Sequence, residues 1–145
     1  MELPSSVLLG QTLKPGTIYL MDDNIFNNGL PHYVVVINKD ILKDSSLFLI
    51  PGTSKIDKRK LYVNKMGLSL KTLVITNPTE CKFLSCPTVF DCNGLLERTI
   101  DEIEDKSNNG QIRAIYNINE DLLKKIRDGV VASRLIPNRI KKCLL

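Results

Sequence analysis

The segment that most constrains the fold is residues 33–37, YVVVI, which is rich in β-branched residues and apolar at every position. Such a run predicts a strand that is buried on both faces. Four more short apolar segments end at or near Gly, Pro or Asn, namely residues 18–21, 47–50, 72–76 and 88–90. Short strands between turn residues are typical of a small barrel or sandwich. A length of 145 residues with 43% hydrophobic residues fits one globular domain, residues 1–145.

The last third of the chain changes its period. Asn119 followed by Glu120 and Asp121 is a helix start, because a short polar side chain caps free amides and acids suit the first turn. The apolar residues that then share one helix face are Leu122, Leu123, Ile126, Val130 and Val131. The residues predicted to face outward are Lys124, Lys125, Arg127 and Asp128. We expect Pro137 to end this helix, a weaker helix over residues 95–104, and one more strand over residues 112–118.

Charge is unevenly distributed along the chain. The net charge is +4, but residues 121–145 hold seven basic and two acidic residues, so the remainder is close to neutral at −1. A second basic cluster covers residues 55–60, and residues 97–105 are acidic. Two basic clusters on a small domain suggest a polyanionic partner, although a solvated helix face or tail explains such clusters too. The second explanation is preferred for Arg134, Arg139, Lys141 and Lys142.

The sequence carries no recognisable targeting or metal-binding signal. Residues 1–4 lack the basic start and apolar core of a secretory signal, so a cytoplasmic location is expected. The longest uncharged run, residues 24–38, is too polar and too short to span a membrane. Cys81, Cys86, Cys92 and Cys143 do not have zinc-knuckle spacing, and reduced, mostly buried thiols are expected. We therefore expect no metal, no cofactor and no membrane partner.

Residues that could carry chemistry lie at the ends of two predicted strands. His32 opens the strongest strand, and Thr53, Ser54 and Lys55 follow the next one after Pro51-Gly52. This turn lacks the upstream glycine of a nucleotide-binding P-loop. If the two strands are neighbours, an imidazole, two hydroxyls and an ammonium group would converge at one edge. On residue type alone, the preferred interpretation of His32 is a surface or hydrogen-bonded loop residue, and that of Thr53 with Ser54 is an ordinary turn.

The order of these segments resembles a known family. Residues 16–19 (GTIY), a loop, residues 34–38 (VVVIN), residues 50–55 (IPGTSK) and a closing amphipathic helix are similar to the MazF/PemK/Kid toxins of toxin-antitoxin systems. The similarity covers roughly residues 14–135. It implies an SH3-like small barrel with a C-terminal helix, and a homodimer. It also implies metal-independent, sequence-selective cleavage of single-stranded RNA, which an antitoxin protein blocks.

The resemblance also assigns roles to individual residues. Thr53 matches the threonine or serine after the family's third strand, and His32 stands where the family usually has an arginine. Both are expected to be catalytic. An imidazole can move protons near neutral pH but is a poorer bidentate phosphate clamp than a guanidinium. The residues expected to contact RNA are Ser54, Lys55, Lys58 and Arg59, with Asp91 and Asn93 as further candidates.

Two functions therefore compete at the level of sequence. The leading hypothesis is an endoribonuclease toxin in which His32 is the general base or acid. The alternative is a barrel that lost catalysis together with the arginine and only binds nucleic acid or a protein partner. The first predicts cleavage with 2′,3′-cyclic phosphate ends, and the second predicts salt-sensitive binding without cleavage.

Overall fold

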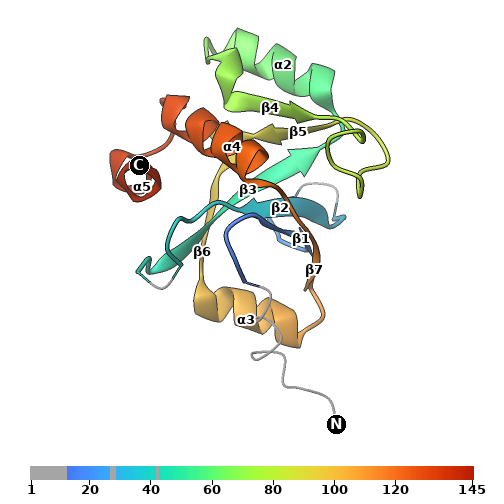
Figure 1. Cartoon of the computed structure of the whole chain (residues 1–145), viewed down its shortest axis with the longest axis vertical. Coiled ribbons are helices and arrows are strands. Elements are labelled where there is room, and N and C mark those ends of the chain that lie inside the picture. Colours follow the sequence, from blue (N-terminus) through green and yellow to red (C-terminus); the bar gives the residue numbers. More distant parts are fainter. Residues whose placement is uncertain (1–12, 27–28, 42) are drawn as a thin grey trace.

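A computed structural model describes residues 13–26, 29–41 and 43–145 (Figure 1). The segment 1–4, on which the absence of a secretory signal was predicted, lies outside these residues. The strands are β1 (Thr17–Met21), β2 (His32–Val36), β3 (Ser46–Thr53), β4 (Leu73–Thr76), β5 (Thr88–Asp91), β6 (Leu96–Thr99) and β7 (Ile112–Asn117). The helices are α2 (Ile56–Lys65), α3 (Ile100–Asn108), α4 (Glu120–Ala132) and α5 (Asn138–Leu144), with short 3₁₀ helices η1 (Leu70–Thr72) and η2 (Cys92–Gly94).

The strands form one antiparallel sheet in the order β4-β5-β3-β2-β1-β7, and β6 pairs with β3 as well. The mainly β prediction is confirmed, as are strands at five of the predicted segments and at residues 112–117. Among the described residues, no pairing joins the end strands β4 and β7. The sheet is therefore open, and the expected closure into an SH3-like barrel is not confirmed.

Strand β3 organises the sheet because it has different partners along its two edges. Its residues 49–52 pair with β2, while residues 46–49 pair with β6 and residues 52–53 with β5. The strand β5–β6 is interrupted by η2 beside Pro51, and a Cβ on Gly94 would lie 3.5 Å from the Pro51 ring. Proline cannot donate a ladder hydrogen bond, so a break in a neighbouring strand fits this position.

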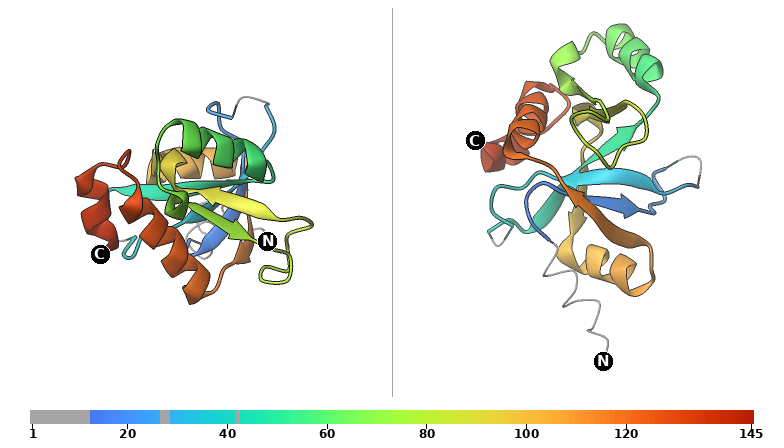
Figure 2. Two further views of the ribbon diagram at one scale, coloured as in Figure 1. Left: turned by 90° about the horizontal axis from the view of Figure 1, so that it is seen from above. Right: turned by 45° about the vertical axis from the view of Figure 1, so that its right-hand side comes forward.

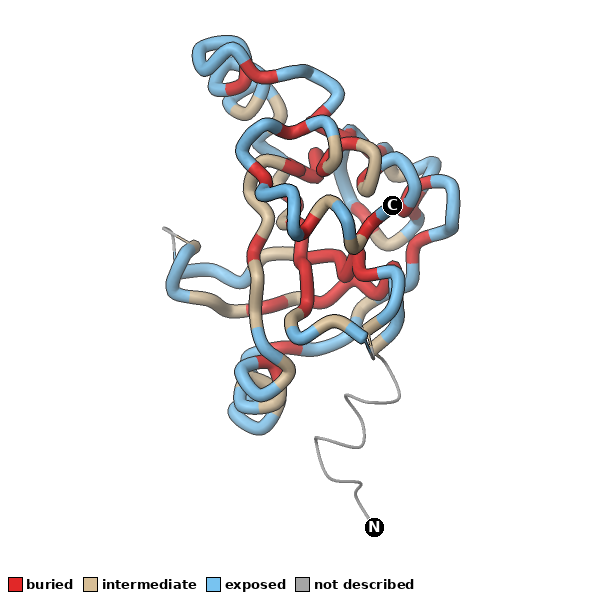
Figure 3. The backbone as a smooth tube through the Cα atoms, turned by 90° about the vertical axis from the view of Figure 1, so that its left-hand side faces the viewer, coloured by how far each residue is buried: buried red, intermediate tan, exposed pale blue. Residues whose placement is uncertain are grey.

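The strands β2 and β3 bury residues on both of their faces, as the apolar run 33–37 predicted for β2. Along β2, Val35 packs into a core beneath α4 and α5, whereas Val34 and Val36 pack into a second core next to α3. In β3, Ile50 packs into the first of these cores and Leu49 into the second. Figure 3 shows the buried residues concentrated in the middle of the molecule. Alternation of side chains along a strand therefore supplies two cores from one sheet.

Helix α2 covers the remaining end of the sheet, far from α3 (Figure 2). It contributes one fully buried residue, Val63, to a small cluster with Leu68, Leu73 and Val89. Leu61 and Tyr62 of the same helix are exposed. The cluster fixes α2 against β4 and β5, and so fixes the basic residues at the start of this helix.

The helix predicted over residues 95–104 differs from the structure. Residues 96–99 form β6, not a helix, because they pair with the first half of β3. The helix begins only at Ile100, where Thr99 and Glu102 form a reciprocal capping box. Thr99 Oγ1 accepts from the Glu102 N–H at 3.1 Å, and Glu102 Oε1 accepts from the Thr99 N–H at 3.3 Å. The cap therefore sets the boundary between strand and helix.

The C-terminal region also differs from its prediction. The helix α4 begins at the predicted cap, where Asn119 Oδ1 accepts from the Leu122 N–H at 2.8 Å. However, it ends at Ala132, before Pro137, and a further helix α5 follows that proline. Arg127, expected to face outward, donates from Nε to the Ile37 carbonyl at 2.7 Å and from Nη2 to the Asn38 carbonyl at 2.9 Å. It therefore joins α4 to the end of β2.

All four cysteines are free, and they differ in burial. Cys81 and Cys92 are buried, Cys143 is half-buried and Cys86 is exposed. In the part of the chain that the structure describes, no helix has the length and apolar character needed to cross a bilayer.

Candidate active site

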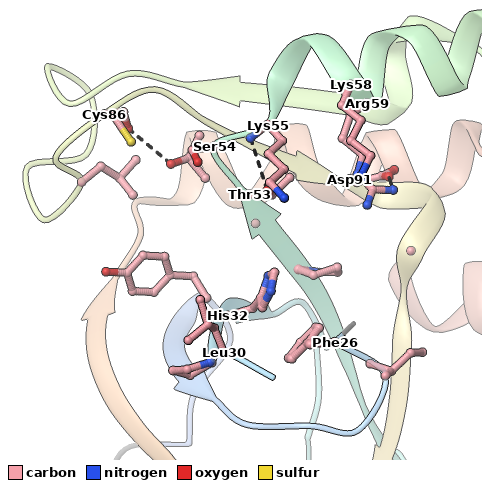
Figure 4. A pocket seen from close by; sticks show the side chains of 18 of the residues that line it. Phe26, Leu30, His32, Thr53, Ser54, Lys55, Lys58, Arg59, Cys86 and Asp91 are labelled. Atoms are coloured by element: carbon pink, nitrogen blue, oxygen red, sulfur yellow. Dashed lines mark hydrogen bonds and ion pairs between the residues drawn. The ribbon is translucent and has the colours of Figure 1, made fainter. Parts of the chain in front are cut away.

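A cavity of about 510 Å³ opens where β2 begins and β3 ends. All six residues proposed from the sequence as catalytic or RNA-binding line it: His32, Thr53, Ser54, Lys55, Lys58 and Arg59. The strand register explains this meeting. The β2–β3 pairing ends at Tyr33 opposite Gly52, so His32 and Thr53 are the next residues on the two strands. Figure 4 shows the imidazole below the turn that carries Thr53 and Lys55.

His32 lies in the half-buried wall of the cavity, and its ring stacks on Phe26 with 4.2 Å between the ring centroids. Burial lowers the pKa of His32, and the positive charges of Lys55 and Arg59 lower it further, whereas a hydrogen bond with the Gly52 backbone raises it. The net direction is downward from 6.5. The imidazole is therefore mostly neutral at pH 7, which is the form that can accept a proton.

The turn after β3 presents hydroxyl and ammonium groups to the same space. Thr53 Oγ1 accepts a hydrogen bond from the Lys55 N–H at 3.2 Å, and the Ile56 N–H donates to the Ser54 carbonyl at 3.0 Å. These bonds turn the chain from β3 directly into α2. Because Thr53 Oγ1 is the acceptor of this bond, its hydroxyl can still donate to a ligand.

Helix α2 adds two more cations from its first turns. Arg59 Nη1 lies 3.6 Å from Asp91 Oδ2, and the Asp91 side chain is only 7% exposed. No carboxylate of the described residues lies within ion-pairing distance of Lys55 or Lys58. Three cations thus line the cavity against one carboxylate, which produces a positive field suited to a phosphate group.

The two further candidates, Asp91 and Asn93, have different places. Asp91 lines the cavity and holds Arg59, while its Oδ1 accepts from the Asn93 N–H at 3.0 Å. The Asn93 side chain is engaged elsewhere. It donates to Thr72 Oγ1 at 2.8 Å and accepts from the Ser133 hydroxyl at 2.7 Å. Asn93 therefore joins η1 and η2 to the end of α4, and it is not among the residues that line the cavity.

The C-terminal basic cluster contributes no residue to this cavity. Arg139 forms two hydrogen bonds to Glu97, at 2.7 and 2.9 Å, and Arg134 donates to the Met66 carbonyl at 2.7 Å. Lys124 pairs with Asp128 one turn along the same helix at 3.0 Å. Arg134 and Arg139 therefore link separate segments of the fold. The sequence had predicted that both residues lie on a solvated helix end or tail, without such contacts.

The walls of the cavity include apolar residues that the sequence did not single out. Phe26 comes from the loop between β1 and β2, and Cys86 from the loop between β4 and β5. Tyr33 also lines the cavity, and its ring contacts Phe83 edge-on at 5.3 Å between centroids. Phe83 in turn stacks on Tyr116 of β7 at 5.1 Å. Nothing local in the sequence assigns Phe26, Tyr33 or Cys86 to this site, because long-range packing brings them to the cavity.

The arrangement can act on an anionic substrate with a mobile proton. A neutral imidazole, a hydroxyl donor and three cations are the parts needed to accept a proton and to bind a phosphodiester. Within the described residues, no three His, Cys, Asp or Glu side chains gather where they could hold a metal ion.

Comparison with known proteins identifies the fold. No family model matches the chain, and no curated protein sequence matches it. Among solved structures, the chain is similar to the Mycobacterium tuberculosis toxin MazF-mt6 with a TM-score of 0.50 and 11% sequence identity. The similarity covers 79% of this chain and 91% of that toxin. The chain therefore has a MazF-like fold. The cavity that contains the six residues proposed from the sequence lies at the junction of β2, β3 and α2.

Proposed function

We propose that this protein is a sequence-selective, metal-independent endoribonuclease toxin that cleaves single-stranded RNA. The observation that carries this proposal is the convergence of His32, Thr53 and Lys55 on one positively charged cavity. The MazF-like fold supports it. The cations that line the cavity match the negative charge of the RNA backbone.

In the proposed reaction, the RNA supplies its own nucleophile. His32 accepts the proton of a 2′-hydroxyl, and that oxygen forms a bond to the adjacent phosphorus. The P–O5′ bond breaks, and the departing O5′ takes a proton from the Lys55 ammonium. The products are a 2′,3′-cyclic phosphate and a 5′-hydroxyl, so atoms and protons balance without a further reagent. The lowered pKa of His32 suits a base, because the ring enters the reaction unprotonated.

The remaining polar groups would stabilise the phosphate as its charge increases. Thr53 donates its hydroxyl, and Lys55, Lys58 and Arg59 supply positive charge, with Ser54 as a further contact. Arg59 is held by Asp91, so its guanidinium is oriented before substrate arrives. His32 stands where the resembling family usually has an arginine. In the proposed reaction the imidazole moves the proton, and the cations of α2 bind the phosphate, so the two tasks fall to different residues.

The proposal extends to the setting of the reaction. We expect a homodimer, an antitoxin protein that blocks the cavity, a cytoplasmic location and one domain over residues 1–145. An antitoxin segment with acidic side chains would complement Lys55, Lys58 and Arg59 by charge. Growth arrest on expression, relieved by co-expression of the antitoxin, is the cellular outcome expected.

The decisive experiment is an RNA cleavage assay on purified protein with end analysis of the products. The intact protein should cleave single-stranded RNA to 2′,3′-cyclic phosphate ends with or without EDTA. His32→Ala should slow cleavage by about 10²–10⁴-fold, the usual contribution of an acid-base group. Thr53→Ala should slow it as well, whereas Thr79→Ala, an exposed threonine outside the cavity, should not.

Other outcomes separate the competing functions. Full activity of His32→Ala would remove the imidazole from the mechanism. Salt-sensitive RNA binding without cleavage would favour the alternative of a catalytically inactive binding module, because phosphate contacts release counterions. Absence of both binding and cleavage would leave a protein-binding domain.

A further inference from the structure

The described residues of the loop between β1 and β2, 22–26 and 29–31, contribute one wall of the cavity, and one of their side chains covers the imidazole. Ile25, Phe26 and Leu30 of this loop line the cavity. The rings of Phe26 and His32 stack at 4.2 Å with 24° between their planes, and Figure 4 shows the two rings side by side below the turn at Thr53. Phe26 thus shields His32 from water.

The start of this loop is fixed by a buried carboxylate. Asp23 is 3% exposed at its side chain, and Arg98 donates to it from Nε at 3.0 Å and from Nη2 at 2.9 Å. Lys106 Nζ lies 3.5 Å from the same carboxylate and donates to the Asp22 carbonyl at 2.6 Å. Arg98 belongs to β6 and Lys106 to α3, and neither lines the cavity. The strand β6 and the helix α3 therefore hold the start of the loop on the side away from the cavity.

A short hydrogen-bonded turn connects this carboxylate to Phe26. Asp23 Oδ1 accepts from the Ile25 N–H at 3.1 Å, and the Asp23 carbonyl accepts from the Phe26 N–H at 3.1 Å. The Phe26 carbonyl then accepts from the Gly29 N–H at 3.3 Å, and Gly29 has a positive φ of 67°. The position of the Phe26 backbone is thus set three residues after the Asp23 anchor.

We propose that Asp23 is a positioning residue of this site: its ion pairs with Arg98 and Lys106 hold the turn that seats Phe26 on His32. Asp23 touches no substrate in this role and acts through Phe26. The importance of this arrangement for RNA cleavage rests on the proposed function, but its effect on the imidazole does not.

The two ways in which Asp23 can influence His32 have opposite signs. If the loop is released, water reaches the imidazole and the desolvation that lowers its pKa is reduced, so the pKa of His32 rises. Loss of a negative charge alone would disfavour the protonated ring and lower the pKa. The other charged groups at the cavity are Lys55, Lys58, Arg59 and Asp91, with the Cys86 thiol and the Tyr33 phenol as further titratable groups. The proposed substitutions leave these groups in place.

His32 is the only histidine in the chain, so a proton NMR titration reports its pKa from a single imidazole signal. We expect the pKa of His32 to rise toward the ordinary value of about 6.5 in Asp23→Asn and in Phe26→Ala. The double variant should show a smaller shift than the two single shifts added together, because both act through one contact. Asp128→Asn, which removes an exposed carboxylate of α4, is the matched control and should leave the pKa unchanged.

Arg98→Lys provides a second route, because it keeps the charge and loses the paired hydrogen bonds to Asp23. It should raise the pKa of His32 in the same direction as Asp23→Asn. An unchanged or lower pKa in Asp23→Asn, or fully additive shifts in the double variant, would overturn the proposal. RNA cleavage is measured on the same samples. If the parent protein does not cleave RNA, the proposed function fails while the titration still decides the role of Asp23.

Discussion

Gly129 of α4 packs so closely on Cys92 that a Cβ at position 129 would lie 2.7 Å from the Cys92 Sγ. The same Cβ would approach the Lys71 carbonyl at 3.0 Å. The absence of a side chain therefore lets α4 rest directly on η1 and η2. Cys92 has little freedom to move away, because it is fully buried and its thiol donates to the Ile126 carbonyl at 3.4 Å.

We predict that Gly129→Ala destabilises the protein, although alanine is the better helix former. The gain in helix propensity is about 1 kcal/mol, while overpacking in a core costs about 1–3 kcal/mol. The free energy of unfolding from urea titration measures the result. Lys125→Ala, on the exposed face of the same helix, is the control and should change it by less than about 0.5 kcal/mol. A stabilised Gly129→Ala would show that the helix can shift at no cost.

The two basic clusters should differ in their effect on RNA binding. Lys58 lines the cavity, whereas Lys142 is exposed on α5. Lys58→Ala should weaken binding of a non-cleavable RNA and reduce the slope of log K against log salt by about 0.7, the value for one contact to a single strand. Lys142→Ala should leave both quantities unchanged. Fluorescence anisotropy at several salt concentrations checks this, and equal effects of the two variants would place the RNA elsewhere.

The sequence predicted those elements whose signal is local. The run Val34–Val36 indicated a doubly buried strand from its own composition, and Asn119 marked the start of α4. The segment that forms β6 was misread because its residues are polar and become a strand only by pairing with β3, nearly fifty residues away. Helix α2 was not predicted because it buries only Val63, so its sequence has no amphipathic stripe.

The candidate site divides in the same way. His32 and Thr53 could be proposed because each lies at the end of a recognisable strand, and neighbouring antiparallel strands bring such ends together. The stacking of Phe26 on His32 and the Arg59–Asp91 ion pair could not be proposed from the sequence, because these contacts depend on how a loop and a helix pack against the sheet. Arg139, which was expected to lie in a solvated tail, forms a salt bridge with Glu97, a residue 42 positions earlier in the sequence.

The anchor at Asp23 should contribute to stability in a pH-dependent way. Burial alone would raise the pKa of Asp23, but hydrogen bonds from Arg98 and Ile25 and the charge of Lys106 lower it from 3.8 to about 2. The contribution is therefore fully present above pH 3.8 and is lost as the pH falls toward 2. Its size is about 2 kcal/mol. The free energy of unfolding, measured by urea titration between pH 6 and pH 2.5, should fall less steeply with decreasing pH in Asp23→Asn than in the parent protein. The same steepness in both proteins would contradict this assignment.

The pH profile of cleavage should follow the charge around His32. With a neutral imidazole as the base, the rate rises with pH through a pKa that lies below 6.5 and levels off near neutrality. Lys55→Met removes a positive neighbour, so protonation becomes easier and the midpoint of this rise should move to higher pH. Single-turnover rates from pH 5 to 8 give the midpoint separately from the plateau rate, which the loss of Lys55 also lowers. Lys141→Met, remote from the cavity, should leave the midpoint in place. A midpoint that stays fixed or falls in Lys55→Met would mean that His32 is not the group whose ionisation limits cleavage.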